Sequence, residues 1–163
     1  MTRLEKAAYL SQIIGAAAVV VSLIYVGRQI SDNTTEVRAN SGRELTTFGQ
    51  ELDSWIVTNP ELAEILTAGS SDYEALSPSH RLRFNQFITT SLNLYEQTFY
   101  YYQNGLLEED GWFGMDAYFR GRMQMGFGWP DGKADDTWRR VWRANEVVYG
   151  EAFRRHVNSG LTS

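Results

Sequence analysis

Metal and thiol chemistry depend on residue types that are scarce in this chain. Its 163 residues include no cysteine and two histidines, His80 and His156, so a disulfide framework, a zinc knuckle and a cysteine nucleophile are excluded. Ser77 and Phe153 stand three positions before the histidines, whereas helical di-iron proteins carry glutamate at that position. We expect no metal site and no cofactor. We expect His156 to lie in the last turn of a final helix, where a cation is favoured.

Acidic side chains offer the remaining catalytic chemistry. Glu96 lies in a tyrosine-rich segment and would need a partner if it faced a core, whereas the simpler interpretation is a half-exposed side chain that pairs with a helix neighbour. Glu108 and Glu109 follow a glycine, where acidic residues favour the positive end of a helix. A hydrolase would need Glu96 to converge with one of them, and a separation above ~10 Å would count against glycosidase-type chemistry. The sequence also contains no nucleophile-elbow or phosphate-binding glycine motif, so we expect a protein that is not an enzyme.

Aromatic and methionine side chains point to binding instead. One group, drawn from several segments, is a candidate aromatic pocket: Tyr95, Phe99, Tyr102, Trp112, Trp138 and Trp142. A second group lies in a glycine-rich segment and is a candidate contact loop: Met123, Met125, Phe127 and Trp129. Methionine adapts to irregular partners, which suits a contact surface. The alternative for this loop is that it folds back to complete the core.

The secondary-structure elements determine where these side chains lie. The first element, near the N-terminus, is strongly apolar. Residues 7–27 carry no charge and are bounded by Lys6 and Arg28. A helix of ~20 residues crosses a hydrocarbon core of about 30 Å, so residues 1–27 are expected to be a transmembrane anchor in the lipid bilayer. A signal peptide has an apolar region of only about 7–15 residues and an A-x-A-like site, and Val26-Gly27-Arg28 is a poor match to that site.

Two stripes on this helix are candidates for contact with other helices. Small residues that let another backbone approach closely recur on one face of the span: Ser11, Gly15, Ala18 and Ser22. A heptad-like stripe continues beyond the span and is a candidate oligomer seam: Ile30, Asn33, Val37 and Asn40. Buried asparagines at such positions fix register and oligomeric state. A plain juxtamembrane helix over residues 28–44 is the alternative, and the partners would be transmembrane helices of a larger complex or of a second copy.

The distribution of charge bears on the binding partners and on the orientation in the membrane. The net charge of −5 and the pI of about 5.0 argue against nucleic acid. Residues 28–80 hold three basic and nine acidic groups, which argues against polybasic lipid binding. Arginine and lysine are nearly balanced across the span, but the short N-terminal tail is easier to translocate. We therefore expect a cytoplasmic C-terminal domain.

Beyond the span, every segment that can be interpreted indicates a helix, so the predicted fold is all-α, with a helical bundle over residues 45–163. Asparagine or serine followed by proline marks two helix starts, at Asn59-Pro60 and Ser77-Pro78. We expect Gly69 to close the first of these helices and Gly105 to follow the second. An interrupted helix near residues 106–124 and one last helix from Thr137 complete the prediction.

Several short motifs together resemble a group of small bacterial proteins that are generally labelled uncharacterised. The motifs are IIGAAAVVVSLIYVGRQI, NPELAEIL, RLRFNQF, EQTFYYYQNGLLEE and a tryptophan-rich final helix with Trp138 and Trp142. The similarity covers most of the chain. It implies an N-terminal bacterial inner-membrane anchor followed by a helical domain, and it implies no catalytic residues. The leading hypothesis is an accessory or scaffold subunit of an inner-membrane complex, and the alternative is a membrane-tethered ligand-binding or sensor module with an aromatic pocket.

Overall fold

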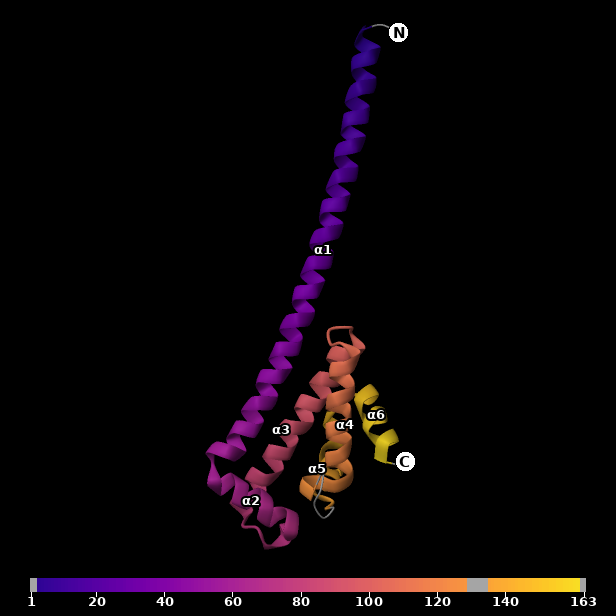
Figure 1. Ribbon diagram of the computed structural model, residues 1–163. Coiled ribbons are helices and arrows are strands. Elements are labelled where there is room, and N and C mark those ends of the chain that lie inside the picture. Colours follow the sequence, from indigo (N-terminus) through magenta and orange to yellow (C-terminus); the bar gives the residue numbers. More distant parts are fainter. Residues whose placement is uncertain (1–2, 129–134, 162–163) are drawn as a thin grey trace. The chain divides into compact units, whose positions relative to one another are not determined.

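The computed structural model describes residues 3–128 and 135–161, and these are almost entirely helical (Figure 1). The helices are α1 (Arg3–Thr58), α2 (Pro60–Ser71), α3 (Pro78–Gln103), α4 (Glu109–Met125), α5 (Thr137–Asn145) and α6 (Glu151–Leu161). Three short 3₁₀ turns join them: η1 (Tyr73–Ala75), η2 (Gly126–Gly128) and η3 (Glu146–Val148). The described residues contain no strand, so the predicted all-α fold is confirmed.

The chain divides into two compact units, residues 1–39 and residues 40–163, and α1 belongs to both. In the first unit α1 exposes its apolar side chains: Ile13, Val21 and Leu23, for example, are each more than half exposed. Its most apolar window has a mean hydropathy of 2.0, and none of that window is buried within the structure. By length and composition, α1 is therefore a helix that could cross a membrane.

The starts of α2 and α3 follow the predicted capping chemistry. The Asn59 Oδ1 atom accepts a hydrogen bond from the backbone N–H of Leu62 at 3.1 Å, and Ser77 Oγ accepts from the N–H of His80 at 3.2 Å. A proline occupies the first turn of each helix, where the missing N–H costs nothing. Both predicted starts are confirmed because each depends on contacts within four residues.

Gly69 does not close α2, and that prediction was wrong. The helix continues through Gly69 to Ser71, and Asp72 caps its end. Gly69 is buried where the Phe84 ring of α3 lies against its backbone, so no Cβ would fit there. The glycine permits close packing of α2 on α3 instead of ending a helix.

The central helix of the second unit is α3, which packs against α2, α4, α5 and α6. Its apolar face, which includes Phe84, Ile88 and Tyr95, is buried, and Tyr102 near its end is half-buried. Gly105 follows it with φ of 68°, a left-handed conformation that favours glycine and that ends the helix as predicted.

The C-terminal part differs from the prediction in two places. Residues 109–125 form the uninterrupted helix α4, where a broken helix was expected. The single last helix expected from Thr137 is two helices, α5 and α6, separated by η3 and an extended Tyr149. At the break, Glu96 Oε1 accepts from the Gly150 N–H at 2.8 Å, and the Tyr100 hydroxyl occupies the place of a Gly150 Cβ. Contacts with α3 therefore end one helix and start the next.

Candidate functional site

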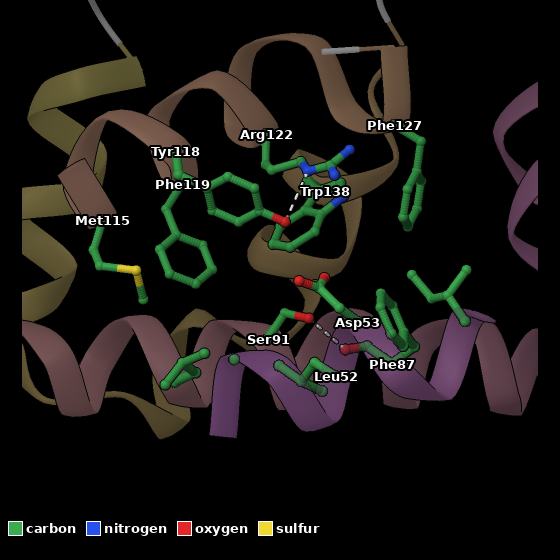
Figure 2. A pocket seen from close by; sticks show the side chains of 13 residues that line it. Leu52, Asp53, Phe87, Ser91, Met115, Tyr118, Phe119, Arg122, Phe127 and Trp138 are labelled. Carbon is green, nitrogen blue, oxygen red and sulfur yellow. Dashed lines mark hydrogen bonds between the residues drawn. The ribbon is translucent and has the colours of Figure 1, made fainter. Parts of the chain in front are cut away.

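The second unit contains a pocket of about 230 Å³ beneath the C-terminal turns of α1 (Figure 2). Five elements supply its walls: α1, α3, α4, η2 and α5. The lining residues are Gly49, Leu52, Asp53, Ile56, Phe87, Ser91, Leu94, Met115, Tyr118, Phe119, Arg122, Phe127 and Trp138. Most of these side chains are apolar or aromatic, as in a typical small-molecule site.

Helical spacing places the α1 residues in this wall. Leu45 and Leu52 are seven residues apart and are both buried, at 4% and 5% exposure, so one stripe of α1 packs on the domain. Leu52 and Ile56 are one turn apart on that stripe. Asp53 lies beside them at the edge of the pocket and is exposed. This stripe therefore holds the C-terminal part of α1 on the domain, and the residues at the edge of the stripe form one wall of the pocket.

The polar groups of the pocket are few, and most of them are bonded within the protein. Ser91 Oγ donates to the carbonyl of Phe87 at 3.0 Å, as the dashed line in Figure 2 shows. Arg122 Nε donates to Tyr118 Oη at 3.2 Å. The Arg122 guanidinium also lies over the Tyr118 ring at 5.2 Å and the Phe127 ring at 5.6 Å, which is cation–π geometry. Arg122 is therefore held in one orientation by two aromatic rings.

Trp138 is an exception to this internal bonding. It is 1% exposed, and its buried Nε1 has no hydrogen-bond partner among the described residues. Trp142, four residues later and equally buried, donates its Nε1 proton to Asn158 Oδ1 at 2.9 Å. A buried indole N–H normally finds an acceptor, so this donor without a partner among the described residues is unusual for a packed core.

Asp135 fixes the wall formed by Phe127. One carboxylate oxygen of Asp135 accepts from the Phe127 N–H at 2.9 Å, and the other accepts from the Thr137 N–H at 2.9 Å and from the Thr137 hydroxyl. Its own N–H donates to the carbonyl of Met125 at 3.2 Å. Gly126 has φ of 59°, and the Asp135 carboxylate lies where its Cβ would be. Asp135 thus joins the end of α4 to the start of α5.

The six residues of the predicted aromatic pocket are divided among different surroundings. Tyr95 and Tyr102 stack on the Trp112 ring, with centroids 6.2 and 5.1 Å away, and Phe99 meets its edge at 5.9 Å. Trp142 stacks on Tyr149 instead. These five residues pack in or against the core, and of the six only Trp138 is among the residues that line the pocket described above. The neighbouring pocket wall from α1 was missed, because nothing in the sequence shows which helix covers Trp138.

The other residues that were predicted to make contacts differ in how deeply they are buried. Met123 is buried, Met125 and Phe127 are half-buried, and Phe127 lines the pocket; Trp129 lies outside the described residues. The small residues of the apolar helix and the candidate seam are all exposed on α1: Ser11, Gly15, Ala18, Ser22, Ile30, Asn33, Val37 and Asn40. Asn40 accepts a hydrogen bond from the Arg43 guanidinium.

Sequence reasoning missed a polar cluster formed by Tyr95, Asp116, Arg120 and His156. Asp116 Oδ1 accepts from the Tyr95 hydroxyl at 2.5 Å and lies 2.7 Å from His156 Nε2, while Asp116 Oδ2 accepts from Arg120 Nε at 2.7 Å. Because the carboxylate oxygen can only accept, this contact is a hydrogen bond when Nε2 carries a ring proton. The expectation that His156 serves the helix end was wrong: it lies mid-way along α6 and fastens that helix to α3 and α4.

The cluster shifts the acidity of two members. Burial raises the pKa of the Tyr95 hydroxyl far above its ordinary value, and the adjacent Asp116 carboxylate raises it further. Burial alone would also raise the pKa of Asp116, but hydrogen bonds from Tyr95, Arg120 and His156 outweigh it and leave that pKa below its ordinary value. Tyr95 and Asp116 are therefore held neutral and ionised respectively. Two features of the sequence could have indicated this cluster. Asp116 and Arg120 are four residues apart on one helix, and His156 follows the core residue Phe153 by three positions.

The acidic residues considered for hydrolysis, Glu96, Glu108 and Glu109, lie in different surroundings. Glu96 is half-buried and bonds the Gly150 N–H, while Glu108 and Glu109 are exposed at the start of α4. Within residues 3–128 and 135–161, no three histidine or acidic side chains gather closely enough to hold a metal ion. We therefore take the pocket as the candidate functional site.

Comparison with known proteins adds no relative: no protein family, curated protein or solved structure matches the chain.

Proposed function

We propose that the protein is a membrane-anchored module that binds a small molecule in the pocket under α1. The observation that carries this proposal is the pocket itself, which measures about 230 Å³ and has mostly apolar walls. Typical drug-sized sites measure about 300–1,000 Å³, so the ligand would be smaller than a drug molecule. Binding, rather than catalysis, is the proposed activity.

The anchor in this proposal is the N-terminal part of α1. Residues 10–27 are uncharged, and the apolar window that contains them is unburied, as suits a helix surrounded by lipid. Together with the resemblance to small bacterial proteins, this supports a single span in a bacterial inner membrane. We place the helical domain on the cytoplasmic side, where the positive-inside rule would favour the arginines that follow the span, Arg28, Arg38 and Arg43.

A pocket-filling variant of the full chain tests the binding proposal. Gly49 lines the pocket, and a Cβ added there would meet no heavy atom within 4 Å. Gly49→Leu should therefore fill the pocket without disturbing α1. Gly42 is also half-buried and unobstructed but does not line the pocket, so Gly42→Leu is the matched control.

The measurement is ligand-observed NMR with a library of small, largely apolar compounds and protein in nanodiscs, with empty nanodiscs as background. We expect compounds that bind the unaltered chain and Gly42→Leu but not Gly49→Leu. If every binder is retained by Gly49→Leu, or if none binds the unaltered chain, the proposed function is wrong.

A second candidate function is that of an accessory or scaffold subunit acting by helix contact. The specific observation in its favour is the unburied apolar surface of α1, which includes the face formed by Ser11, Gly15, Ala18 and Ser22. Gly15→Ile would block close approach of another helix on that face. Purification from native membranes should then lose a co-migrating membrane protein that Val20→Ile, a conservative change on the opposite face of the helix, retains.

A further inference from the structure

The pocket lies between the C-terminal part of α1 and helix α4; this inference rests on the proposed binding function. It is lined from α1 by Leu52 and Ile56, and from one face of α4 by Met115, Phe119 and Arg122. Figure 2 shows Leu52 on one side of the pocket, with Met115 and Arg122 across from it. A molecule in the pocket would therefore contact α1 and α4 at the same time.

A stripe of apolar side chains holds the C-terminal part of α1 on the domain: Leu45, Phe48, Leu52 and Ile56. Leu52 and Ile56 line the pocket, whereas Leu45 and Phe48 do not. Part of the stripe therefore borders the pocket instead of packing against other side chains. Side chains beside a cavity lose the dispersion contacts that neighbouring atoms would supply, so α1 is attached less firmly there than a fully packed interface would allow.

Hydrogen bonds attach α1 at a point away from the pocket. Among the described residues, those that join residues 40–58 to another helix both end on Glu44. The Tyr101 hydroxyl donates to Glu44 Oε2 at 3.0 Å, and Gln97 Nε2 donates to Glu44 Oε1 at 3.4 Å. At its C-terminal end α1 meets α2 through Asn59, which has φ of −124° and ψ of 90°. A non-helical residue between two helices can serve as a hinge.

The docked arrangement, in which residues 40–58 lie on the domain, is therefore linked to what the pocket holds. A molecule that contacts α1 and α4 together loses one side of its site when α1 moves away. A compound that binds one of two states lowers the relative population of the other by a factor of 1 + [L]/Kd, where [L] is its free concentration. At about ten times Kd, the undocked population falls about tenfold.

We propose that a molecule bound in the pocket completes the interface between α1 and α4, and that its binding fastens α1 to the domain. Because α1 also carries the proposed membrane span, the bound molecule regulates how firmly the helical domain is attached to its anchor helix. In the protein without that molecule, residues 40–58 leave the domain more often.

An introduced thiol measures this docking, because the chain contains no cysteine of its own. Leu45 is 4% exposed and does not line the pocket, so a bound molecule cannot shield position 45 directly. The full chain with Leu45→Cys is held in nanodiscs, and its rate of reaction with a maleimide is measured. The probes are indole and the tightest-binding compound of the nanodisc screen. At about ten times its Kd, a bound probe should slow the reaction about tenfold.

A permanent occupant supplies the same test without any added compound. Gly49→Leu places a side chain at the pocket, so it should slow the reaction of the thiol in the Leu45→Cys chain. Gly42→Leu is the matched control, since it lies one turn from position 45 on the other side and does not line the pocket. Ser41→Cys is a second reporter, because Ser41 is also buried on α1 and cysteine has nearly the same shape. It keeps the test decisive if Leu45→Cys fails to fold.

A change at the other attachment point shows that the thiol reports on docking. Tyr101→Phe removes the hydroxyl that donates to Glu44, so it should speed the reaction about two- to tenfold. Tyr102→Phe is the control, because Tyr102 packs on Trp112 instead, and it should leave the rate unchanged.

The outcomes separate this inference from the proposed function. A probe that binds and leaves the rate of the introduced thiol unchanged overturns the inference, as does an equal rate in Gly49→Leu and Gly42→Leu; in both cases the pocket still binds a molecule. If no compound of the screen binds the unaltered chain, the proposed function itself is wrong.

Discussion

At the scale of single residues, Asp116 connects several helices through one carboxylate. Its carboxylate is 14% exposed and is shared by Tyr95, Arg120 and His156. The aspartate comes from α4, and its partners come from α3, α4 and α6, so one side chain joins three helices. Removing a charge from such a site leaves several donors without their acceptor.

Asp116→Asn should therefore destabilise the protein by about 2–3 kcal/mol, since the amide keeps the shape but supplies one acceptor oxygen instead of two. Urea unfolding followed by circular dichroism checks the value. Asp136→Asn is the control, because Asp136 is exposed and forms a surface pair with Arg140 at 3.2 Å; it should cost less than about 0.5 kcal/mol. Equal losses in the two variants would show that the cluster does not stabilise the fold.

The lowered pKa of Asp116 also predicts how stability depends on pH. A group whose pKa is depressed in the folded state contributes stability above its unfolded pKa and loses it as pH falls through the folded value. The ordinary value for aspartate is 3.8, so the contribution should be complete above about pH 5 and should decline below pH 4. Unfolding free energies measured from pH 6 to pH 3 should fall less steeply in Asp116→Asn than in the unaltered protein.

At the scale of elements, the sequence-based predictions agree with the structure where they depend on local contacts and fail where they depend on contacts between distant residues. The Asn59 and Ser77 caps and the stop at Gly105 were predictable because each acts within a single helical turn. The break between α5 and α6 was not, since it depends on Glu96, which is 54 residues away from Gly150. The Gly69 prediction failed for the same reason: a glycine that ends a helix and one that admits a neighbouring ring look identical in sequence.

The candidate site was predictable only in part. Of the six residues predicted to form an aromatic pocket, only Trp138 lines the pocket described above, together with Phe127 of the predicted contact loop. The residues Gly49, Leu52 and Asp53 were not recognised, because a pocket wall depends on which face of α1 meets α3 and α4. That choice is made by tertiary packing and leaves little trace in periodicity.

The junction between α4 and α5 gives a prediction about the pocket wall. Asp135→Asn should weaken the binding of the small apolar compounds found in the nanodisc screen about three- to tenfold, because an amide cannot accept from both Phe127 and Thr137 as the carboxylate does. Titration of the full chain checks this, with Asp136→Asn as the neighbouring control. If Asp135→Asn binds as tightly as the unaltered chain, Phe127 is held by other contacts.

At the scale of the whole molecule, the sequence combines one apolar helix with an acidic helical domain. The mean hydropathy of −0.37 is an average over these two parts, whereas the most apolar window of α1 reaches 2.0. The proposed span therefore depends on a short segment of the chain. Charges placed inside that segment should affect the location of the entire protein.

Val20→Lys combined with Leu23→Lys should release the protein from the membrane, because each lysine near the centre of a span costs about 2.5–3.5 kcal/mol. Extraction of membranes at alkaline pH, followed by sedimentation, separates inserted from released protein. Thr34→Lys combined with Val37→Lys, which adds the same charge beyond Arg28, should remain in the pellet. Identical behaviour of the two double variants would exclude residues 10–27 as the anchor.

The cluster around Asp116 also fixes an order of events during synthesis. His156 follows Asp116 by 40 residues, so the ribosome adds it about 2–8 s later. The apolar segment of α1 is complete well before either residue. If residues 10–27 are the proposed anchor, a nascent chain can engage the bilayer while its last helix does not yet exist, and the domain is then fastened on a protein that is already at the membrane.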